Sequence, residues 1–341
     1  MKIAIRTDAG ASIGFGHLIR MKSLAAALLK SGTEMEICFF TRSPSEIAAD
    51  FITVPIPSCY SQKQELKLLP EQLQKQNCHI LIIDSYSYGC RELDEVSKWP
   101  VYSVYYDDLN RHAFNVNCVV NCNLPGTELA YHGSSTFLLG PSYALLRPEF
   151  TNLPVKAIIS RIKNILITFG GADIKNATPL ILSWLKNSPR FHDHCYHVVI
   201  GPAFTGKEAI TREANGNSNI ILYHNADISS LVQNCDLAVS AAGQTVHELM
   251  AGGLPALLIE TADNQHPNIT AAAASGAAIN LGIFENIKPR EFLNHFEYLC
   301  NHEPTRLSMS LAGPKLIDGR GAERLAHKLI DLYFANGANT L

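Results

Sequence analysis

The chain has 341 residues, about twice the length of a typical domain, which predicts two domains. Hydrophobic residues make up 47% and charged residues 17%, which is typical of a globular enzyme. A net charge of −3, with neither basic runs nor charged tails, argues against a nucleic-acid partner or binding to a membrane surface.

The first residues read as a strand, without the charged and apolar regions of a secretory signal. No apolar run approaches the length of a membrane span. The nine cysteines stand at irregular spacings without a CxxC pair, which favours reduced thiols. We therefore expect a cytoplasmic protein that does not insert into a membrane.

The first predicted strand, residues 2–7, runs into a glycine-containing loop that ends at His17. Gly14 and Gly16 allow the backbone to turn tightly. Apolar residues at helical spacing predict a helix over residues 17–30, and the positive end of its dipole disfavours an imidazolium. A neutral imidazole can accept a proton, so His17 is a candidate general base. The alternative is a histidine that only caps or packs the helix.

A dinucleotide site fits the same loop poorly. The third glycine of a GxGxxG motif would fall at Ile19, and no acidic residue stands cleanly at the end of the second predicted strand, residues 35–40. The GxxxxGK signature of a P-loop is absent.

Strand-like runs alternate with helical stretches along the whole chain. In the first half, strands are predicted at 2–7, 35–40, 79–83, 101–106, 117–121 and 136–139, with helices at 17–30, 63–76 and 89–98. In the second half, strands are predicted at 164–169, 197–200, 219–222, 237–240 and 255–259. Continuous apolar runs are typical of parallel strands covered on both faces. The pattern predicts two doubly wound α/β domains with a boundary near 148–160, and a last amphipathic helix over 321–334.

Three loops in the second half follow predicted strands, where ligands bind in such sheets. Gly170 and Gly171 permit close approach of a phosphate or sugar, although an ordinary turn also uses glycines. Glu248, early in a helix, can accept hydrogen bonds from ribose hydroxyls, or is a glutamate favoured by the helix dipole alone. Asn264 and Gln265 suit hydroxyl and acetamido groups, or belong to a solvated loop.

No metal site is predicted. HExxH is absent, and the cluster His192, His194 and His197 is interpreted as a solvated loop. Asp107 and Asp108 are adjacent and lack the DxD spacing of metal-dependent transferases, so a cation there is disfavoured.

Taken together, these motifs resemble the GT-B superfamily, in which two Rossmann-like domains bind a nucleotide sugar. Residues 240–249, 252–256 and 263–265 are similar to the donor-nucleotide half of the lipid-II-forming N-acetylglucosaminyltransferase. The first half is more diagnostic. It resembles the UDP-sugar hydrolases of pseudaminic acid biosynthesis (PseG-type) and related spore-coat polysaccharide proteins, through RTDAGASIGFGHLIR at 6–20 and through residues 82–86, 107–108, 140–150 and 317–322.

The resemblance implies a GT-B fold, with two Rossmann-like doubly wound domains that face a central cleft. Residues 1–152 would carry the catalytic histidine and the sugar side of the site, and residues 153–341 would bind UDP. The implied reaction is inverting hydrolysis of UDP-2,4-diacetamido-2,4,6-trideoxy-β-L-altrose to UDP and the free sugar. It needs no cofactor, and other enzymes of nonulosonic acid biosynthesis are possible partners.

The resemblance also implies residue roles. His17 activates water, Tyr86 orients the water or a sugar substituent, and Asn264 holds the sugar; Tyr88 could take the place of Tyr86. The implied substrate-binding residues are Asp8, Gly14, Gly16, Arg20, Gly170, Gly171, Ile228, Gly243, Gln244, Thr245, Glu248 and Gln265, with the uracil near residues 223–228.

Three rival functions use the same scaffold. A GT-B glycosyltransferase would need an acceptor groove, a UDP-sugar 2-epimerase would need further carboxylates near C2, and a nucleotide-sugar-binding protein would bind without turnover.

Overall fold

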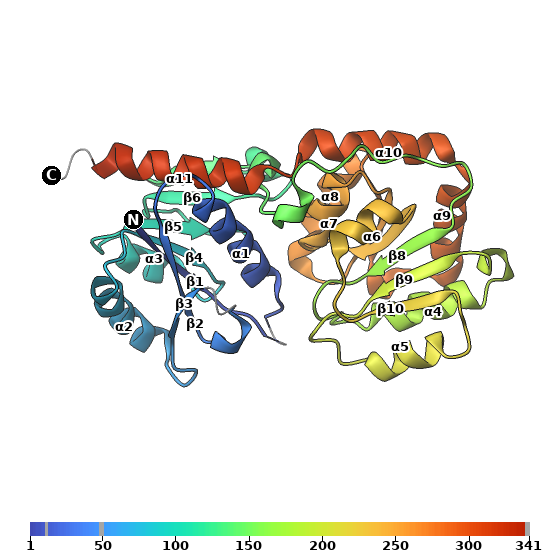
Figure 1. Ribbon diagram of the computed structural model, residues 1–341, viewed down its shortest axis with the longest axis horizontal. Helices are drawn as coiled ribbons and strands as arrows, with labels where there is room; N and C mark the ends of the chain where they lie inside the picture. Colours follow the sequence, from blue (N-terminus) through green and yellow to red (C-terminus); the bar gives the residue numbers. More distant parts are fainter. Residues whose placement is uncertain (11–12, 48–50, 338–341) are drawn as a thin grey trace. The chain divides into compact units, whose positions relative to one another are not determined.

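The computed structural model describes residues 1–10, 13–47 and 51–337 (Figure 1). Contacts divide the chain into two compact units. Unit 1 is Met1–Pro148 together with the segment that begins at Arg320, and unit 2 is Glu149–Gly319. In the described ranges, no helix combines the length and the apolar character needed to cross a membrane.

Unit 1 contains a seven-stranded parallel sheet in the order β3-β2-β1-β4-β5-β6-β7. The strands are β1 (Lys2–Thr7), β2 (Glu36–Thr41), β3 (Ile52–Pro55), β4 (Ile80–Asp84), β5 (Tyr102–Tyr106), β6 (Cys118–Asn121) and β7 (Thr136–Leu139). All five residues of β4 are buried, as the apolar run at 80–83 predicts for a strand covered on both faces.

Helices cover both faces of this sheet. One apolar cluster joins it to α1 (Gly16–Leu29) and α11 (Gly321–Gly337), and a second joins it to α2 (Gln62–Lys75) and α3 (Cys90–Val96). Figure 1 shows α11, in red, running beside the blue and cyan elements of unit 1. The expected domains 1–152 and 153–341 assign this helix to the second domain, whereas its leucines pack into the core of unit 1.

Unit 2 contains a six-stranded parallel sheet in the order β10-β9-β8-β11-β12-β13. Its strands are β8 (Asn164–Thr168), β9 (Cys195–Val199), β10 (Ile220–Tyr223), β11 (Leu237–Ala241), β12 (Ala256–Glu260) and β13 (Ile279–Ile283). Its helices are α4 (Ala177–Lys186), α5 (Lys207–Ala214), α6 (Ile228–Asn234), α7 (Thr245–Ala251), α8 (His266–Ala274), α9 (Pro289–Asn301) and α10 (Glu303–Leu316). Short 3₁₀ turns connect several elements of the two units, at Pro44–Glu46, Gly126–Glu128, Pro141–Tyr143, Pro148–Phe150, Pro189–Phe191, Asp263–Gln265 and Phe284–Asn286.

The predicted α/β class with parallel, doubly wound sheets is confirmed. The sequence missed two strands, β3 and β13, which both lie at sheet edges. Neither contains a fully buried residue, so neither shows the continuous apolar run that marks the central strands.

The order of each sheet reverses at one place. In unit 1 this place lies between β1 and β4, and in unit 2 it lies between β8 and β11. The loops after such neighbouring strands diverge to opposite faces and leave room for a ligand at the carboxyl edge. The His17 loop follows β1, and the loop with Gly170 and Gly171 follows β8.

Candidate active site

His17 is the second residue of α1, as predicted, and it contacts a carboxylate at the end of the neighbouring strand. Its Nδ1 lies 2.6 Å from Oδ1 of Asp84, the last residue of β4. Burial by itself would raise the pKa of Asp84, but Arg20 and His17 hold it at about 2. Asp84 is therefore ionised at neutral pH and can only accept hydrogen bonds.

This charge fixes the tautomer of the imidazole. Because Asp84 accepts, Nδ1 of His17 must carry the proton that is donated to it. The Nη2 of Arg20, 2.9 Å from the same nitrogen, is then a close neighbour and not a donor to it. The neutral ring keeps the lone pair on Nε2, which can take a proton, while Asp84 stabilises the imidazolium that forms. The structure thus pairs the imidazole of His17 with a carboxylate that orients it.

Arg20 holds the two carboxylates of this site together. Its Nε donates to Asp84 over 2.7 Å, and its two terminal nitrogens donate to Asp108 over 3.0 and 2.9 Å. The guanidinium also lies 3.9 Å above the ring centre of Tyr106, and the side chain is buried. Arg20 therefore joins Asp84 to Asp108 within unit 1, and the substrate contact implied by the resemblance stays a prediction.

Tyr86 packs against His17. Its ring meets the His17 ring edge-on, with 4.6 Å between the centroids, and its hydroxyl donates to Asp108 over 2.8 Å. Half of Tyr86 is exposed, whereas Tyr88 is buried and donates its hydroxyl to Glu65. Of the two tyrosines left open by the sequence, Tyr86 is the one that stands beside His17.

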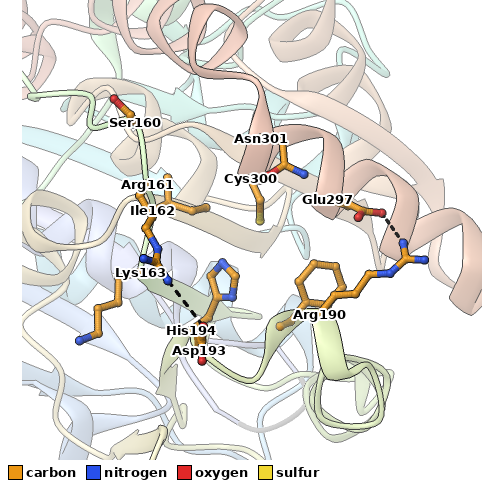
Figure 2. A pocket seen from close by; sticks show the side chains of 11 residues that line it. Ser160, Arg161, Ile162, Lys163, Arg190, Asp193, His194, Glu297, Cys300 and Asn301 are labelled. Carbon is orange, nitrogen blue, oxygen red and sulfur yellow. Dashed lines mark hydrogen bonds and ion pairs between the residues drawn. The ribbon is translucent and has the colours of Figure 1, made fainter.

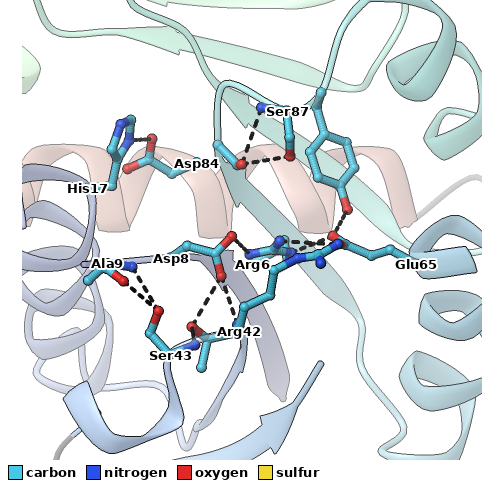
Figure 3. A network of polar contacts seen from close by, with 12 residues as sticks. Arg6, Asp8, Ala9, His17, Arg42, Ser43, Glu65, Asp84 and Ser87 are labelled. Atoms are coloured by element: carbon cyan, nitrogen blue, oxygen red, sulfur yellow. Dashed lines mark hydrogen bonds and ion pairs between the residues drawn. The ribbon is translucent and has the colours of Figure 1, made fainter. Parts of the chain in front are cut away.

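A second buried network lies next to this site (Figure 3). Glu65 accepts hydrogen bonds from Arg6, Arg42 and Tyr88. Burial opposes the charge of Glu65, but hydrogen bonds from Arg6 hold its pKa below the usual value. Asp8 pairs with Arg6 over 2.7 Å and accepts the backbone N–H of Arg42 over 2.8 Å. Both oxygens of Asp8 are therefore engaged by groups of unit 1.

The two networks border one pocket of about 600 Å³ at the carboxyl edge of the sheet. The pocket is lined by residues that follow β1 and β2, by the end of β4 and the loop after it, and by residues at the starts of α1 and α2: Asp8, Ile13, His17, Arg42, Gln62, Asp84, Ser85, Tyr86 and Ser87. Gly14 and Gly16 lie in the loop that leads to His17, and Gly14 has the left-handed φ of +83° that favours glycine. Predicted residues of unit 1 thus gather around a cavity large enough for a sugar.

In unit 2, the loop after β8 turns at Gly170, whose φ is +72°. Gly171 follows it, and the carbonyl oxygen of Gly171 lies too close to Gly201 for any larger residue there. Asp173, a little further on, accepts the backbone N–H groups of Ala177 and Thr178 at the start of α4. The anion-binding end of α4 is therefore filled by a carboxylate of the chain itself.

The loops after β11 and β12 meet beside this turn, because β11 lies between β8 and β12. The Nε2 of Gln265 lies 3.9 Å from the position that a side chain on Gly243 would occupy, and its Oε1 accepts the N–H of Thr261. Gln244 occupies the position before α7, which begins at Thr245, and its side chain makes no capping hydrogen bond to the helix. Three predicted residues of unit 2 remain. Glu248 is buried on α7, and Asn264 is exposed in the turn before α8. Ile228 begins α6, and this helix packs on α7.

Asp107 and Asp108 already have protein partners. Asp107 accepts hydrogen bonds from Tyr131 and the backbone of Asn110, and Asp108 accepts from Arg20 and Tyr86. Over the described ranges, no group of three or more histidine, cysteine or acidic side chains is arranged to hold a metal ion. In the predicted histidine cluster, His197 instead bonds Tyr223 and Asn164, and burial lowers the pKa of His194.

A larger pocket, about 1010 Å³, lies elsewhere in unit 2 (Figure 2). It is bounded by the segment that enters β8, the loop that enters β9, and α9, so it lies at the amino ends of these strands. Ion pairs join Arg161 to Asp193 over 3.6 Å and Arg190 to Glu297 over 2.7 Å. None of the predicted site residues lines it.

The chain is similar in sequence to known proteins at low identity. No protein-family model matches the chain. The spore coat polysaccharide biosynthesis protein SpsG of Bacillus subtilis is 24% identical over 98% of this chain and 99% of that protein. A UDP-2,4-diacetamido-2,4,6-trideoxy-β-L-altropyranose hydrolase of Campylobacter jejuni is 23% identical over 73% of this chain and 88% of that protein.

Among solved structures, MurG of Acinetobacter baumannii matches 97% of this chain and 100% of its own, with a TM-score of 0.68 and 15% identity. This likeness shows the fold. The two parallel sheets are Rossmann-like, as in GT-B glycosyltransferases.

Sequence reasoning assigned no role to several residues of the site. Asp84 and Asp108 lie in stretches that support the family resemblance, but neither was given a role in orienting the site, and a cation at Asp107 and Asp108 was disfavoured. Arg42, Gln62 and Glu65 were not singled out as site residues. An acidic residue at the end of the strand beside β1 could have indicated Asp84, but only with the strand order known.

Proposed function

We propose that the chain is a nucleotide-sugar-processing enzyme that hydrolyses UDP-2,4-diacetamido-2,4,6-trideoxy-β-L-altrose. The main observation behind this proposal is the contact between His17 and Asp84, which both line the pocket of unit 1. In this proposal, Nε2 of His17 is the atom that accepts a proton. The similarity to the Campylobacter jejuni hydrolase supports the substrate, and the GT-B fold supports a nucleotide-sugar donor.

In this reaction His17 accepts a proton from water as the water oxygen attacks the anomeric carbon. The bond from that carbon to the UDP oxygen breaks, UDP keeps the electron pair, and the configuration inverts. Asp84 stabilises the imidazolium, and a positioned base of this kind contributes roughly 10²–10⁴ in rate. The oxygen of Tyr86, whose own proton is donated to Asp108, can accept a hydrogen bond that orients the water.

Unit 2 would hold the nucleotide. The backbone at Gly170, Gly171 and Gly243, with Gln244 and Thr245, would bind the diphosphate, where N–H groups stabilise the charge that develops on the leaving group. Glu248 would bind the ribose, with the uracil near Ile228. Asn264 and Gln265 would contact the sugar.

The test is hydrolysis of the proposed substrate followed by NMR, without any acceptor and with EDTA present. We expect release of UDP and of free sugar with inverted anomeric configuration. His17→Asn should abolish release and keep UDP affinity, whereas Glu248→Ala should weaken UDP binding. UDP binding without sugar release by the native chain would refute hydrolysis, and undiminished turnover by His17→Asn would refute the base.

A further inference from the structure

We propose that Gln62 and the apolar walls of the unit 1 pocket recognise an N-acetyl group of the sugar. This specificity rests on the proposed function, because it describes the sugar side of the same site. The inference comes from a buried amide donor and from two exposed apolar surfaces that line one cavity with His17.

Gln62 is the first residue of α2 and is held in place by its neighbours. Ser61 caps this helix through a reciprocal pair of hydrogen bonds with Gln64. Arg42 donates to the carbonyl oxygens of Ser58 and Tyr60, which fixes the segment that leads into the helix. The position of Gln62 is therefore set by two independent sets of hydrogen bonds.

The amide nitrogen of Gln62 is buried and has no hydrogen-bond partner among the described residues. Buried donors in proteins are almost always paired, and an unpaired one costs free energy that a ligand oxygen would recover. Gln62 lines the pocket, so rotation of its amide about the last side-chain bond directs the N–H at a bound carbonyl oxygen.

The same pocket has apolar walls. Ile13 is 52% exposed and Tyr86 is 50% exposed, and both line the cavity. A methyl group that covers these surfaces is removed from water, which favours binding. A carbonyl oxygen and a methyl group on one planar substituent are the two halves of an acetamido group.

The cations at the pocket are paired with carboxylates, which favours a neutral substituent over an anionic one. Asp84 faces Arg20, and Asp8 is paired with Arg6. Arg42 is engaged by Glu65, whose side chain is fully buried. A phosphate or carboxylate would therefore find no unpaired cation among these groups, whereas an amide needs none.

The test compares variants of Gln62 in the full chain. Gln62→Leu removes the donor, Gln62→Glu replaces it with an acceptor, and Gln74→Leu is the matched control at an exposed position of the same helix. With the diacetamido substrate, we expect both Gln62 variants to raise KM tenfold or more, with kcat within about twofold and UDP affinity unchanged. The Gln74→Leu variant should match the native chain. An unchanged KM in Gln62→Leu would overturn the inference and leave the hydrolase intact.

A binding measurement keeps the test decisive if the native chain does not hydrolyse this substrate. Saturation-transfer NMR with the free 2,4-diacetamido-2,4,6-trideoxy sugar should show saturation of the acetyl methyl groups, and 6-deoxyaltrose should show little binding. Gln62→Leu should lose the methyl signal while retaining the native circular dichroism spectrum. Equal saturation in the native and Gln62→Leu chains, or equal binding of both sugars, would refute N-acetyl recognition independently of turnover.

Discussion

At the scale of single residues, the orientation of His17 depends on Asp84, which is 67 residues away in sequence. The start of α1 supplies the position of the histidine, and Asp84 selects its tautomer by accepting the Nδ1 proton. The helix dipole, which opposes an imidazolium, is thus countered by a fully ionised neighbour. The carboxylate of Asp84 lies where it would stabilise the positive charge if His17 took a proton.

Asp84→Asn should lower kcat roughly 10³–10⁴-fold, because an amide can present its N–H to Nδ1 and force the wrong tautomer. UDP affinity should stay unchanged, since the proposed UDP contacts lie in unit 2. The measurement is kcat together with the UDP dissociation constant, and ¹⁵N NMR of the imidazole should show the Nδ1 proton lost.

The control is Asp331→Asn, an exposed position on α11. A fall in kcat of less than tenfold in Asp84→Asn, with the Nδ1 proton retained, would show that Asp84 does not position the base.

Single residues also show which parts of the site could be predicted from the sequence and which could not. The His17 loop is local, so its glycines, its helix and its histidine could be predicted from 12 or so consecutive residues. Asp84 and Gln62 approach the site only because β4 lies beside β1 and α2 follows β3, and such contacts depend on the strand order.

At the scale of elements, the carboxyl ends of β1 and β2 are joined to α2 through Glu65. This carboxylate is fully buried between Arg6 and Arg42, and its pKa is lowered by its partners despite burial. A group whose pKa is lower in the folded state stabilises the fold above its unfolded pKa. That contribution is lost as the pH falls toward the folded value.

We therefore expect the free energy of unfolding of unit 1 to decline as the pH falls below about 4.3, the ordinary value for glutamate. Asp84 adds to the decline between its ordinary pKa of 3.8 and its pKa of about 2 in the folded chain. Glu65→Gln should cost roughly 3–5 kcal/mol at pH 7, because it removes a buried carboxylate that pairs with both Arg6 and Arg42. It should also flatten the pH dependence below about pH 4.3.

Urea unfolding at several pH values measures both effects, with Glu71→Gln, an exposed position on α2, as the control. An acid decline that is equally steep in Glu65→Gln and in the native chain would contradict this role of Glu65.

Elements also differ in how well the sequence predicts them. The central strands have continuous apolar runs because both faces are covered, and these runs identified β1, β4, β8 and β11. The edge strands β3 and β13 are partly exposed and carry mixed residues, so the same criterion does not detect them.

At the scale of the whole molecule, the chain leaves unit 2 after Gly319, and its helix α11 packs in unit 1. Leu325 and Leu329 of α11 are buried in the cluster that includes Leu18 and Met21 of α1. The amphipathic pattern of α11 predicts an apolar face but not the surface that covers it. For this reason the sequence predicted the helix but placed it in the domain expected at 153–341, whereas α11 packs against α1 of unit 1.

This arrangement predicts which unit loses stability when α11 is altered. Leu325→Ala removes a fully buried side chain and should cost about 2–5 kcal/mol. The two tryptophans separate the units, because Trp99 lies in unit 1 and Trp184 in unit 2. Denaturant unfolding followed by fluorescence in Trp184→Phe and Trp99→Phe backgrounds therefore reports each unit alone.

In the Leu325→Ala chain, the transition of Trp99 should move to lower denaturant concentration while that of Trp184 stays in place. Leu311→Ala, at a half-exposed leucine of α10, should move neither by a comparable amount. A shift of the Trp184 transition alone would place the stabilising contacts of α11 in unit 2, as the sequence had suggested.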